Sequence, residues 1–249
     1  MKALHQWLRP GERLDDLQLN NLHLIQDPDS FCFGVDAVLL SHFARVKKGE
    51  QVVDLGTGSG VIPILLAGRH PHCRITGVEL QPEMAERAGR SVAMNGLSDR
   101  ITILARDIRD IREVLAPASV DVVTSNPPYL VPGGLVNPRE TRAIARHEIT
   151  LTLEQLMEQA AWLLKPGGRF YLIHRPHRLV DICVLGRQVQ LEPKWMQLVH
   201  PYAHKPPAMV LMQLNRDGRP ELKHHPPLVI RQEDGSYTPQ LLDCYRQPE

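Results

Sequence analysis

Four consecutive residues, Asn126-Pro127-Pro128-Tyr129, follow the apolar run 120–125 and could do chemistry on an amino group. An amino nitrogen attached to a π system, as in adenine or a carboxamide, is a poor nucleophile because its lone pair is delocalised. The side-chain oxygen of Asn126 and the carbonyl of Pro127 can accept its two hydrogens and favour the pyramidal nitrogen that forms during attack. Tyr129 can stack on the ring. We therefore predict Asn126, Pro127 and Tyr129 as catalytic residues; the alternative is a stiff loop that only ends a strand.

A second group of residues lies upstream and is typical of a nucleotide-binding turn. It consists of an acidic residue and three alternating glycines: Asp54, Gly56, Gly58 and Gly60. Glycines let the backbone turn sharply and approach a ligand at the N-terminus of a helix, here expected over 61–69. A dinucleotide fingerprint needs glycine or alanine one place after Gly60, where this chain has Val61, so the pattern disfavours a nicotinamide cofactor.

Two further carboxylates are expected at strand ends. Glu79 closes a predicted strand over 74–80 and can accept both hydroxyls of a ribose. Asp107 follows a predicted strand over 101–105 and can contact an adenine amino group. Both residues also precede predicted helices, so simple helix N-capping is the alternative for each. Because open α/β sheets bind ligands at the carboxyl ends of their strands, we expect all these groups at one edge.

The elements that must position these residues follow from periodicity and stop signals. The expected order is a β-hairpin over 12–26, a helix over 37–46 with Asp36 at its N-cap, strands and helices alternating from Gln51, a helix over 81–94, a strand over 120–125, a helix over 152–164 stopped by 165–168, a strand over 169–174, a helix over 176–186, strands over 195–201 and 208–215, a turn at Asp234-Gly235 and a helix over 239–245. This order predicts an α/β fold with a doubly wound, mostly parallel sheet. We expect residues 1–30 to form a hairpin extension, 31–215 the main domain and 216–249 a tail, made of a small hairpin around 228–238 and a short helix, packed on the same domain.

Bulk composition is that of an ordinary globular protein of 249 residues, with 43% hydrophobic and 23% charged residues. No apolar stretch approaches the roughly 18 residues of a membrane span, and residues 1–10 lack a signal-peptide core. Four widely spaced cysteines without a Cys-x-x-Cys pair indicate reduced thiols, so we expect a cytoplasmic protein with no metal and no membrane association. The net charge of +1 does not by itself indicate nucleic acid.

Together the motifs resemble the S-adenosylmethionine-dependent methyltransferases that act on amino nitrogens. The resemblance implies a seven-stranded sheet whose last strand is antiparallel, in agreement with seven candidate strands here. It also implies that Asp54 and the three glycines line the methionine moiety, that Glu79 holds the ribose hydroxyls and that Asp107 contacts the adenine. Asn126 would lie between this cofactor and the substrate.

Further segments narrow the resemblance, and they extend over nearly the whole chain: Glu12-Arg13-Leu14-Asp15-Asp16-Leu17, Ile25-Gln26, Phe31 to Leu40, Glu79-Leu80-Gln81, Ala145-Arg146-His147-Glu148, Arg175-Pro176 and Pro226-Pro227-Leu228. They are similar to the family of tRNA(Val) adenine-N(6) methyltransferases, which modify adenosine next to the anticodon. The resemblance implies that Phe33 and Asp36 belong to a segment that closes over the cofactor, and that the partner is the anticodon loop of a tRNA. Arg139, Arg142, Arg146 and Arg175 are candidates for phosphate contacts.

Other functions remain open on the residues alone. Enzymes that methylate a glutamine amide of release factors share Asn-Pro-Pro-Tyr, but they carry a sizeable helical domain before the glycine turn. Methylation of a guanine amino group in ribosomal RNA is another alternative. A DNA adenine would require a DNA-reading domain, and none is visible. A scaffold that binds cofactor or a partner without turnover would be expected to have lost acceptors such as Asn126, which is present.

Overall fold

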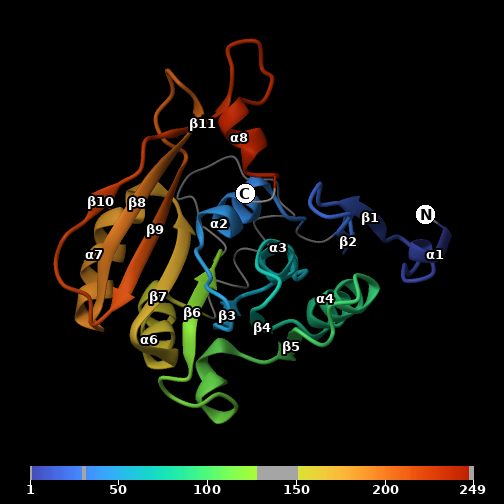
Figure 1. Cartoon of the computed structure of the whole chain (residues 1–249), viewed down its shortest axis with the longest axis horizontal. Helices are drawn as coiled ribbons and strands as arrows, with labels where there is room; N and C mark the ends of the chain where they lie inside the picture. Colours follow the sequence, from blue (N-terminus) through green and yellow to red (C-terminus); the bar gives the residue numbers. More distant parts are fainter. Residues whose placement is uncertain (1, 30–31, 128–150, 247–249) are drawn as a thin grey trace.

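The computed structural model describes residues 2–29, 32–127 and 151–246, with the side chains of residues 2 and 3 left undescribed. In this part of the chain nine strands form one sheet, in the order β10-β8-β9-β7-β6-β3-β4-β5, with β11 also paired to β8 (Figure 1). The strands are β3 (Gln51–Leu55), β4 (Arg74–Glu79), β5 (Ile101–Ala105), β6 (Val120–Ser125), β7 (Leu164–His174), β8 (Leu191–Tyr202), β9 (Met209–Arg216), β10 (Lys223–His224) and β11 (Leu228–Arg231).

The sheet confirms the expected doubly wound topology. Strands β3 to β7 run parallel to one another, whereas β9 runs antiparallel to both β7 and β8. Strand order reverses at β3, which has β4 on one side and β6 on the other. That reversal is the point where open α/β sheets hold ligands, outside the carboxyl ends of the strands.

Helices cover both faces of the sheet (Figure 1). The helices in the described part of the chain are α1 (Lys2–His5), α2 (Val35–Phe43), α3 (Val61–Arg69), α4 (Pro82–Met94), the 3-10 helix η1 (Ile108–Glu113), α6 (Leu153–Leu163), the 3-10 helix η2 (Pro176–Arg178), α7 (Leu179–Gln188) and α8 (Pro239–Asp243). Val52 joins a core cluster with residues of α2 and α3, while the next residue, Val53, joins a cluster with residues of α6 and η1. This alternation leaves the central strands buried on both faces, as parallel sheets require.

Two local expectations are wrong. Helix α2 begins at Val35 with Gly34 at the N-cap position and no side-chain cap, so Asp36 lies inside the first turn. Residues 165–168 were expected to end a helix as a loop, but they lie within β7. Val120 pairs with Leu164 and Val122 with Arg169, so the four residues bulge out of a strand that starts where α6 stops.

The N-terminal hairpin is present and rests on α4. Its strands, β1 (Arg13–Asp16) and β2 (His23–Gln26), pair antiparallel. The amide N–H of His23 donates to Asn95 Oδ1 at 2.9 Å, and the side chain of Asn95 returns a bond to the His23 carbonyl at 2.7 Å. Glu12 lies between Arg87 and Arg90 of α4, at 3.1 and 2.6 Å. These contacts fix the hairpin beside the β5 side of the sheet (Figure 1).

The C-terminal tail extends the opposite side of the sheet, where β10 and β11 both pair in parallel with β8. An antiparallel bridge between Arg231 and Tyr237 closes the expected turn at Asp234-Gly235. Leu241 of α8 is fully buried. No helix within the described ranges is long and apolar enough to cross a membrane.

Candidate functional site

The glycine turn after β3 has the backbone geometry that its sequence predicts. Gly56, Gly58 and Gly60 have φ values of 77°, 57° and 85°, in the left-handed region that favours glycine. A Cβ atom on Gly60 would lie 3.1 Å from the Cβ of Ala88, so this glycine also lets the turn pack closely on α4. The N–H groups of Gly56 and Thr57 both donate to the carbonyl of Val78, which joins the turn to β4.

Asp54 lies at this turn with no exposed surface. Thr124 of β6 donates its hydroxyl to Asp54 Oδ1 at 2.6 Å. Burial raises the pKa of the Asp54 carboxyl to about 6, and the hydrogen bond from Thr124 opposes that rise. Asp54 Oδ2 and Thr57 Oγ1 are buried and make no hydrogen bond of standard geometry within the described residues, but the Thr57 hydroxyl is near enough to Asp54 to help lower its pKa. The Asp54 carboxylate keeps acceptor capacity for a polar ligand at this strand end.

Glu79 connects the glycine turn to the start of α4. Its side chain is buried, its Oε2 accepts from the N–H of Gly58 at 2.8 Å, and its Oε1 accepts from the N–H of Gln81 at 2.9 Å. Gln81 is the N-cap residue of α4, and no side chain caps this helix, so the capping alternative is not observed for Glu79. Each carboxylate oxygen keeps capacity for a further donor, so the predicted ribose contact stays chemically open.

Asp107 lies two residues after Ala105, the partner of Glu79 in the β4–β5 ladder. It is the N-cap residue of η1, where its Oδ1 accepts from the N–H of Arg109 at 2.8 Å. The side chain of Arg109 also pairs with this carboxylate and lowers its pKa. The capping alternative is therefore observed for Asp107, and the adenine contact stays a prediction.

Asn126 is the first residue after β6, and it meets Asp36 across 90 positions of sequence. Its Nδ2 donates to Asp36 Oδ2 at 3.0 Å. The preceding residue, Ser125, donates its hydroxyl to the carbonyl of Leu55 at 2.8 Å, which brings the ends of β6 and β3 together. Asn126 and Pro127 are both half-buried. The contact thus joins two residues that the sequence placed at the cofactor and at the substrate.

Phe33 is half-buried against the α2 and α3 core, and its N–H donates to Gln26 Oε1 at 3.2 Å. Gln26 is buried, and its Nε2 donates to the hydroxyl of Ser59 in the glycine turn at 3.1 Å. One amide therefore connects β2, the Phe33 segment and the turn. Gln26 belongs to the segments that carried the family resemblance, but only its position at the end of a buried edge strand signals a role.

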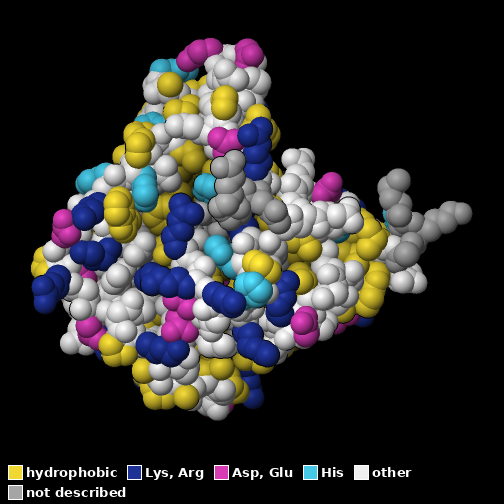
Figure 2. Space-filling view, viewed as in Figure 1, with side chains coloured by type: hydrophobic (Ala, Val, Ile, Leu, Met, Phe, Trp, Pro, Cys, Tyr) yellow, Lys and Arg dark blue, Asp and Glu magenta, His cyan; other side chains and the backbone are white. Residues whose placement is uncertain are grey.

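Several predictions fall on residues that the structure does not describe: Tyr129, Arg139, Arg142, Arg146 and the segment 145–148. Arg175 is described, and its Nη1 donates to the carbonyl of Ala208 at 3.2 Å. Figure 2 shows Lys and Arg side chains spread over the centre and left of one face, with Asp and Glu side chains among them. This mixed pattern does not mark an RNA surface by itself. No group of three or more His, Cys, Asp or Glu side chains suited to a metal occurs in the described ranges.

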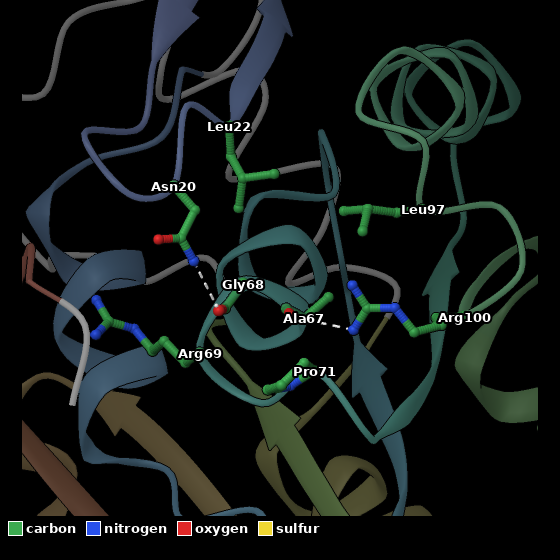
Figure 3. Close-up of a pocket in the computed structure, with 8 residues that line it drawn as sticks. All are labelled: Asn20, Leu22, Ala67, Gly68, Arg69, Pro71, Leu97 and Arg100. Carbon is green, nitrogen blue, oxygen red and sulfur yellow. Dashed lines mark hydrogen bonds between the residues drawn. The ribbon is translucent and has the colours of Figure 1, made fainter. Parts of the chain in front are cut away.

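A surface hollow of about 430 Å³ lies away from this site, at the C-terminal end of α3 (Figure 3). Asn20 donates to the carbonyl of Gly68 at 2.9 Å and Arg100 donates to that of Ala67 at 3.1 Å. These side chains satisfy carbonyls that a helix leaves unpaired at its C-terminus. Helix α3 starts at the carboxyl end of β3 and leads to the start of β4, so the hollow lies at the amino edge of the sheet. It is a helix-capping feature.

Comparisons with known proteins agree with this geometry. A family described as "Methyltransferase domain" matches residues 46–206. The tRNA1(Val) (adenine(37)-N6)-methyltransferase of Porphyromonas gingivalis (strain ATCC 33277) is 34% identical over 218 residues, which cover 84% of this chain and 85% of the relative. The enzyme of the same name from Pedobacter heparinus is 32% identical over 211 residues, covering 85% and 86%. The corresponding Tolumonas auensis enzyme is 30% identical over 229 residues, covering 88% and 90%.

Among solved structures, the fold is similar to that of a predicted O-methyltransferase, Atu636 from Agrobacterium tumefaciens. The TM-score is 0.68 at 24% identity, over 86% of this chain and 98% of that chain. Pyrococcus horikoshii TYW2, solved in complex with MeSAdo, gives a TM-score of 0.58 at 14% identity, over 84% and 73% of the two chains. At these identities the structures show a shared fold, while the curated relatives show the family. The chain belongs to the tRNA1(Val) (adenine(37)-N6)-methyltransferase family and is an S-adenosylmethionine-dependent methyltransferase.

Proposed function

We propose that this chain methylates the exocyclic amino group of the adenosine next to the anticodon in a valine tRNA, the reaction named for its relatives. One observation supports this proposal above the others. Asn126 follows β6 beside the point where the strand order reverses, and its amide nitrogen is bonded to Asp36 at 3.0 Å. An amide oxygen at that place suits a planar substrate that carries an NH2 group.

The donor is S-adenosylmethionine, which supplies a methyl group on an electrophilic sulfonium. The residues present fit such a ligand. Asp54 is a buried carboxylate with spare acceptor capacity beside the glycine turn, where the cationic methionine end would lie. Glu79 keeps acceptor capacity for the ribose hydroxyls, and Asp107 is the candidate for the adenine. Phe33 and Asp36 belong to the segment that we place over the cofactor. These assignments are proposals that rest on position and chemistry.

On the substrate side, the Asn126 oxygen and the Pro127 carbonyl would each accept one hydrogen of the adenosine amino group. Both bonds strengthen as the nitrogen becomes pyramidal, so they stabilise the transition state more than the bound substrate. A strong general base is unnecessary because the nitrogen's proton becomes acidic once the methyl is attached, so it can leave to solvent. The base must leave its stack in the anticodon loop at a cost of a few kcal/mol. Stacking on Tyr129 is the proposed offset, about 1–3 kcal/mol.

The elements before β3 bear on the rival substrate, a glutamine amide of a release factor. The segment before β3 forms the short α1, a two-stranded hairpin and α2, which differs from the helical domain expected of a release-factor methyltransferase.

We place the enzyme in the cytoplasm, a proposal that four free cysteines support.

The test uses unmodified tRNA1(Val) transcript and S-adenosylmethionine carrying a tritiated methyl group. We expect transfer to that transcript, with mass spectrometry locating the methyl at the adenosine next to the anticodon. Replacing Asn126→Ala should remove about 2–4 kcal/mol of transition-state stabilisation, or roughly 30- to 1000-fold in kcat. A transcript with guanosine at that position and a release-factor substrate are the controls. Tight cofactor binding without transfer to tRNA would refute the proposal.

A further inference from the structure

The contact between Asp36 and Asn126 ties the start of α2 to the end of β6. Asn126 Nδ2 lies 3.0 Å from Asp36 Oδ2, and both residues are half-buried. An ionised carboxylate only accepts hydrogen bonds, so the nitrogen of the Asn126 amide has to face it. The amide oxygen is thereby turned away from Asp36.

The direction of that oxygen matters because a primary amide has two unlike ends. Rotation about its terminal side-chain bond exchanges a carbonyl acceptor for an NH2 donor at nearly the same place. An Asn126 in the reversed orientation would present its own hydrogens to the hydrogens of an amino substrate. A donor facing a donor leaves both unsatisfied and costs binding in a buried site.

Asp36 is itself held in place. Its second oxygen, Oδ1, accepts from the N–H of Ala37 at 2.9 Å. A Cβ atom on Gly34 would lie 2.9 Å from the same oxygen, so glycine at that position leaves room for the carboxylate. The neighbouring N–H of Phe33 is bonded to the buried amide of Gln26. The carboxylate therefore has a fixed location relative to the glycine turn as well as to Asn126.

We infer that Asp36 is a positioning residue: it fixes the Asn126 amide so that the oxygen faces the substrate, and so makes the site select an amino group over a carbonyl. This inference rests on the proposed function, because it assigns the residue that orients the proposed acceptor. It differs from a role in cofactor binding alone, which would act on cofactor affinity and leave the orientation of Asn126 unaffected.

The first experiment separates the two roles with Asp36→Asn, which keeps the size and removes the obligate acceptor. We expect kcat on tRNA at saturating cofactor to fall roughly 10- to 100-fold, while the Kd for S-adenosylmethionine, measured by calorimetry, changes less than about threefold. Asp99→Asn, an exposed change remote from the site, should leave both values unchanged. A variant with weakened cofactor binding and normal kcat would overturn the inference.

A double-mutant cycle tests whether Asp36 acts through Asn126. In the Asn126→Ala background the Asp36→Asn change should have almost no further effect on kcat, because the group it orients is absent. Full additivity of the two losses would overturn the inference. Asp36→Ala serves as a second variant, and thermal midpoints show that each protein is folded.

A selectivity readout uses tRNA1(Val) transcript with inosine at the target position, which replaces the amino group by a carbonyl. Wild-type enzyme should bind this transcript more weakly than the adenosine form. Asp36→Asn should reduce that ratio because the freed amide can turn its NH2 towards the carbonyl. An unchanged ratio would count against the inference.

The last readout does not depend on activity. The side-chain NH2 signals of Asn126, assigned by their loss in Asn126→Ala, should shift in the spectrum of Asp36→Asn relative to wild type. If the signals shift but no tRNA is methylated, the proposed function fails and the contact stands. If they do not shift, the positioning inference fails whatever the activity.

Discussion

Asp54 is a buried carboxylate at the carboxyl end of β3, and its burial lowers the stability of the folded protein when the carboxylate is ionised. Its side chain has no exposed surface, and burial raises its pKa to about 6. A pKa above that of the unfolded chain, near 3.9, means that the folded protein binds the proton more tightly. The contribution of Asp54 to the free energy of unfolding is therefore most favourable below about pH 4, and it is lost as pH rises through 6.

The first prediction follows from that sign. Asp54→Asn removes the buried charge, so the difference in unfolding free energy between variant and wild type should grow by about 2–3 kcal/mol between pH 4 and pH 6, in favour of the variant. Urea unfolding at half-unit steps of pH measures this difference. Asp99→Asn is the exposed control. A difference that does not depend on pH would show that Asp54 titrates normally.

Gln26 gives the second prediction at this scale. Its amide bonds both Ser59 in the glycine turn and the N–H of Phe33, so Gln26→Met would leave two polar groups without partners. We expect a loss of about 1–3 kcal/mol in unfolding free energy and a cofactor Kd raised several-fold. Calorimetry with S-adenosylmethionine and urea unfolding measure the two effects. Gln240→Met, which removes one bond to the N–H of Val229 in the tail, should leave cofactor binding intact.

Sequence reasoning located the glycines but not the role of Gln26, and the reason is physical. A positive φ is a local demand that glycine meets by itself, so three alternating glycines indicate the turn without knowledge of the fold. Gln26 acts between segments that are distant in sequence, and its partners become visible only after the hairpin has docked. The same holds for Asp36, whose partner lies 90 positions away.

At the scale of elements, the bounds of helices and strands that have a clear hydrophobic periodicity agree closely with the bounds predicted from the sequence. Helix α3 and strand β6 have the predicted bounds, 61–69 and 120–125. The segment 165–168 differs because its course is set by pairing with β6, which forces a bulge that no local pattern encodes. The course of 165–168 was thus missed because it depends on a neighbouring strand.

The hairpin offers a test of how one element is held on another. Glu12 is almost fully buried between Arg87 and Arg90, and the hydrogen bond from Arg90 is the main cause that lowers its pKa to about 2. A lowered pKa stabilises the folded chain above about pH 4.5, and this contribution is lost as pH falls towards 2. The hairpin in turn carries Gln26 to the glycine turn, so its attachment bears on the site.

The third prediction is that Glu12→Gln destabilises the protein by about 3 kcal/mol at pH 7, because Arg87 and Arg90 lose the carboxylate that they share and are left with Asp27 and Glu86 respectively. The loss should shrink when unfolding is measured near pH 2.5, where wild-type Glu12 is largely protonated in the unfolded chain and partly so in the folded one. Glu83→Gln changes an exposed glutamate of the same helix and is the matched control. An equal effect of the two variants at pH 7 would contradict the proposed attachment.

At the scale of the whole molecule, the tail closes on residues from the first half of the chain. The main sheet was predicted without β10 and β11: β10 is short, and β11, predicted only as an arm of the small hairpin that its bridge to Tyr237 closes, also pairs with β8. Arg69, at the end of α3, donates to the carbonyls of Cys244 and Arg246. This contact spans most of the sequence, and a single arginine late in an apolar helix gives no sign of it.

The reactivity of the Cys244 thiol shows whether the tail stays packed against α3. It is buried, and burial raises the pKa of its thiol to about 11, so almost no thiolate forms at pH 8. Because thiolate is the reactive form, labelling by a disulfide reagent at pH 8 requires α8 to detach first. The labelling rate is then a measure of how often the tail opens.

The fourth prediction is that Arg69→Met accelerates labelling of Cys244 by about tenfold or more, because the carbonyls of Cys244 and Arg246 lose their donor. Arg100→Met is the matched control: it removes an arginine of the same hollow whose side chain donates to the carbonyl of Ala67 and not to the tail, so it should leave Cys244 protected (Figure 3). Cys73, buried in the main core, should stay unlabelled in both variants and rules out global unfolding. If Cys244 stays equally protected in Arg69→Met, then packing of Leu241 and strand pairing hold the tail, and the arginine only satisfies carbonyls that would otherwise bind water.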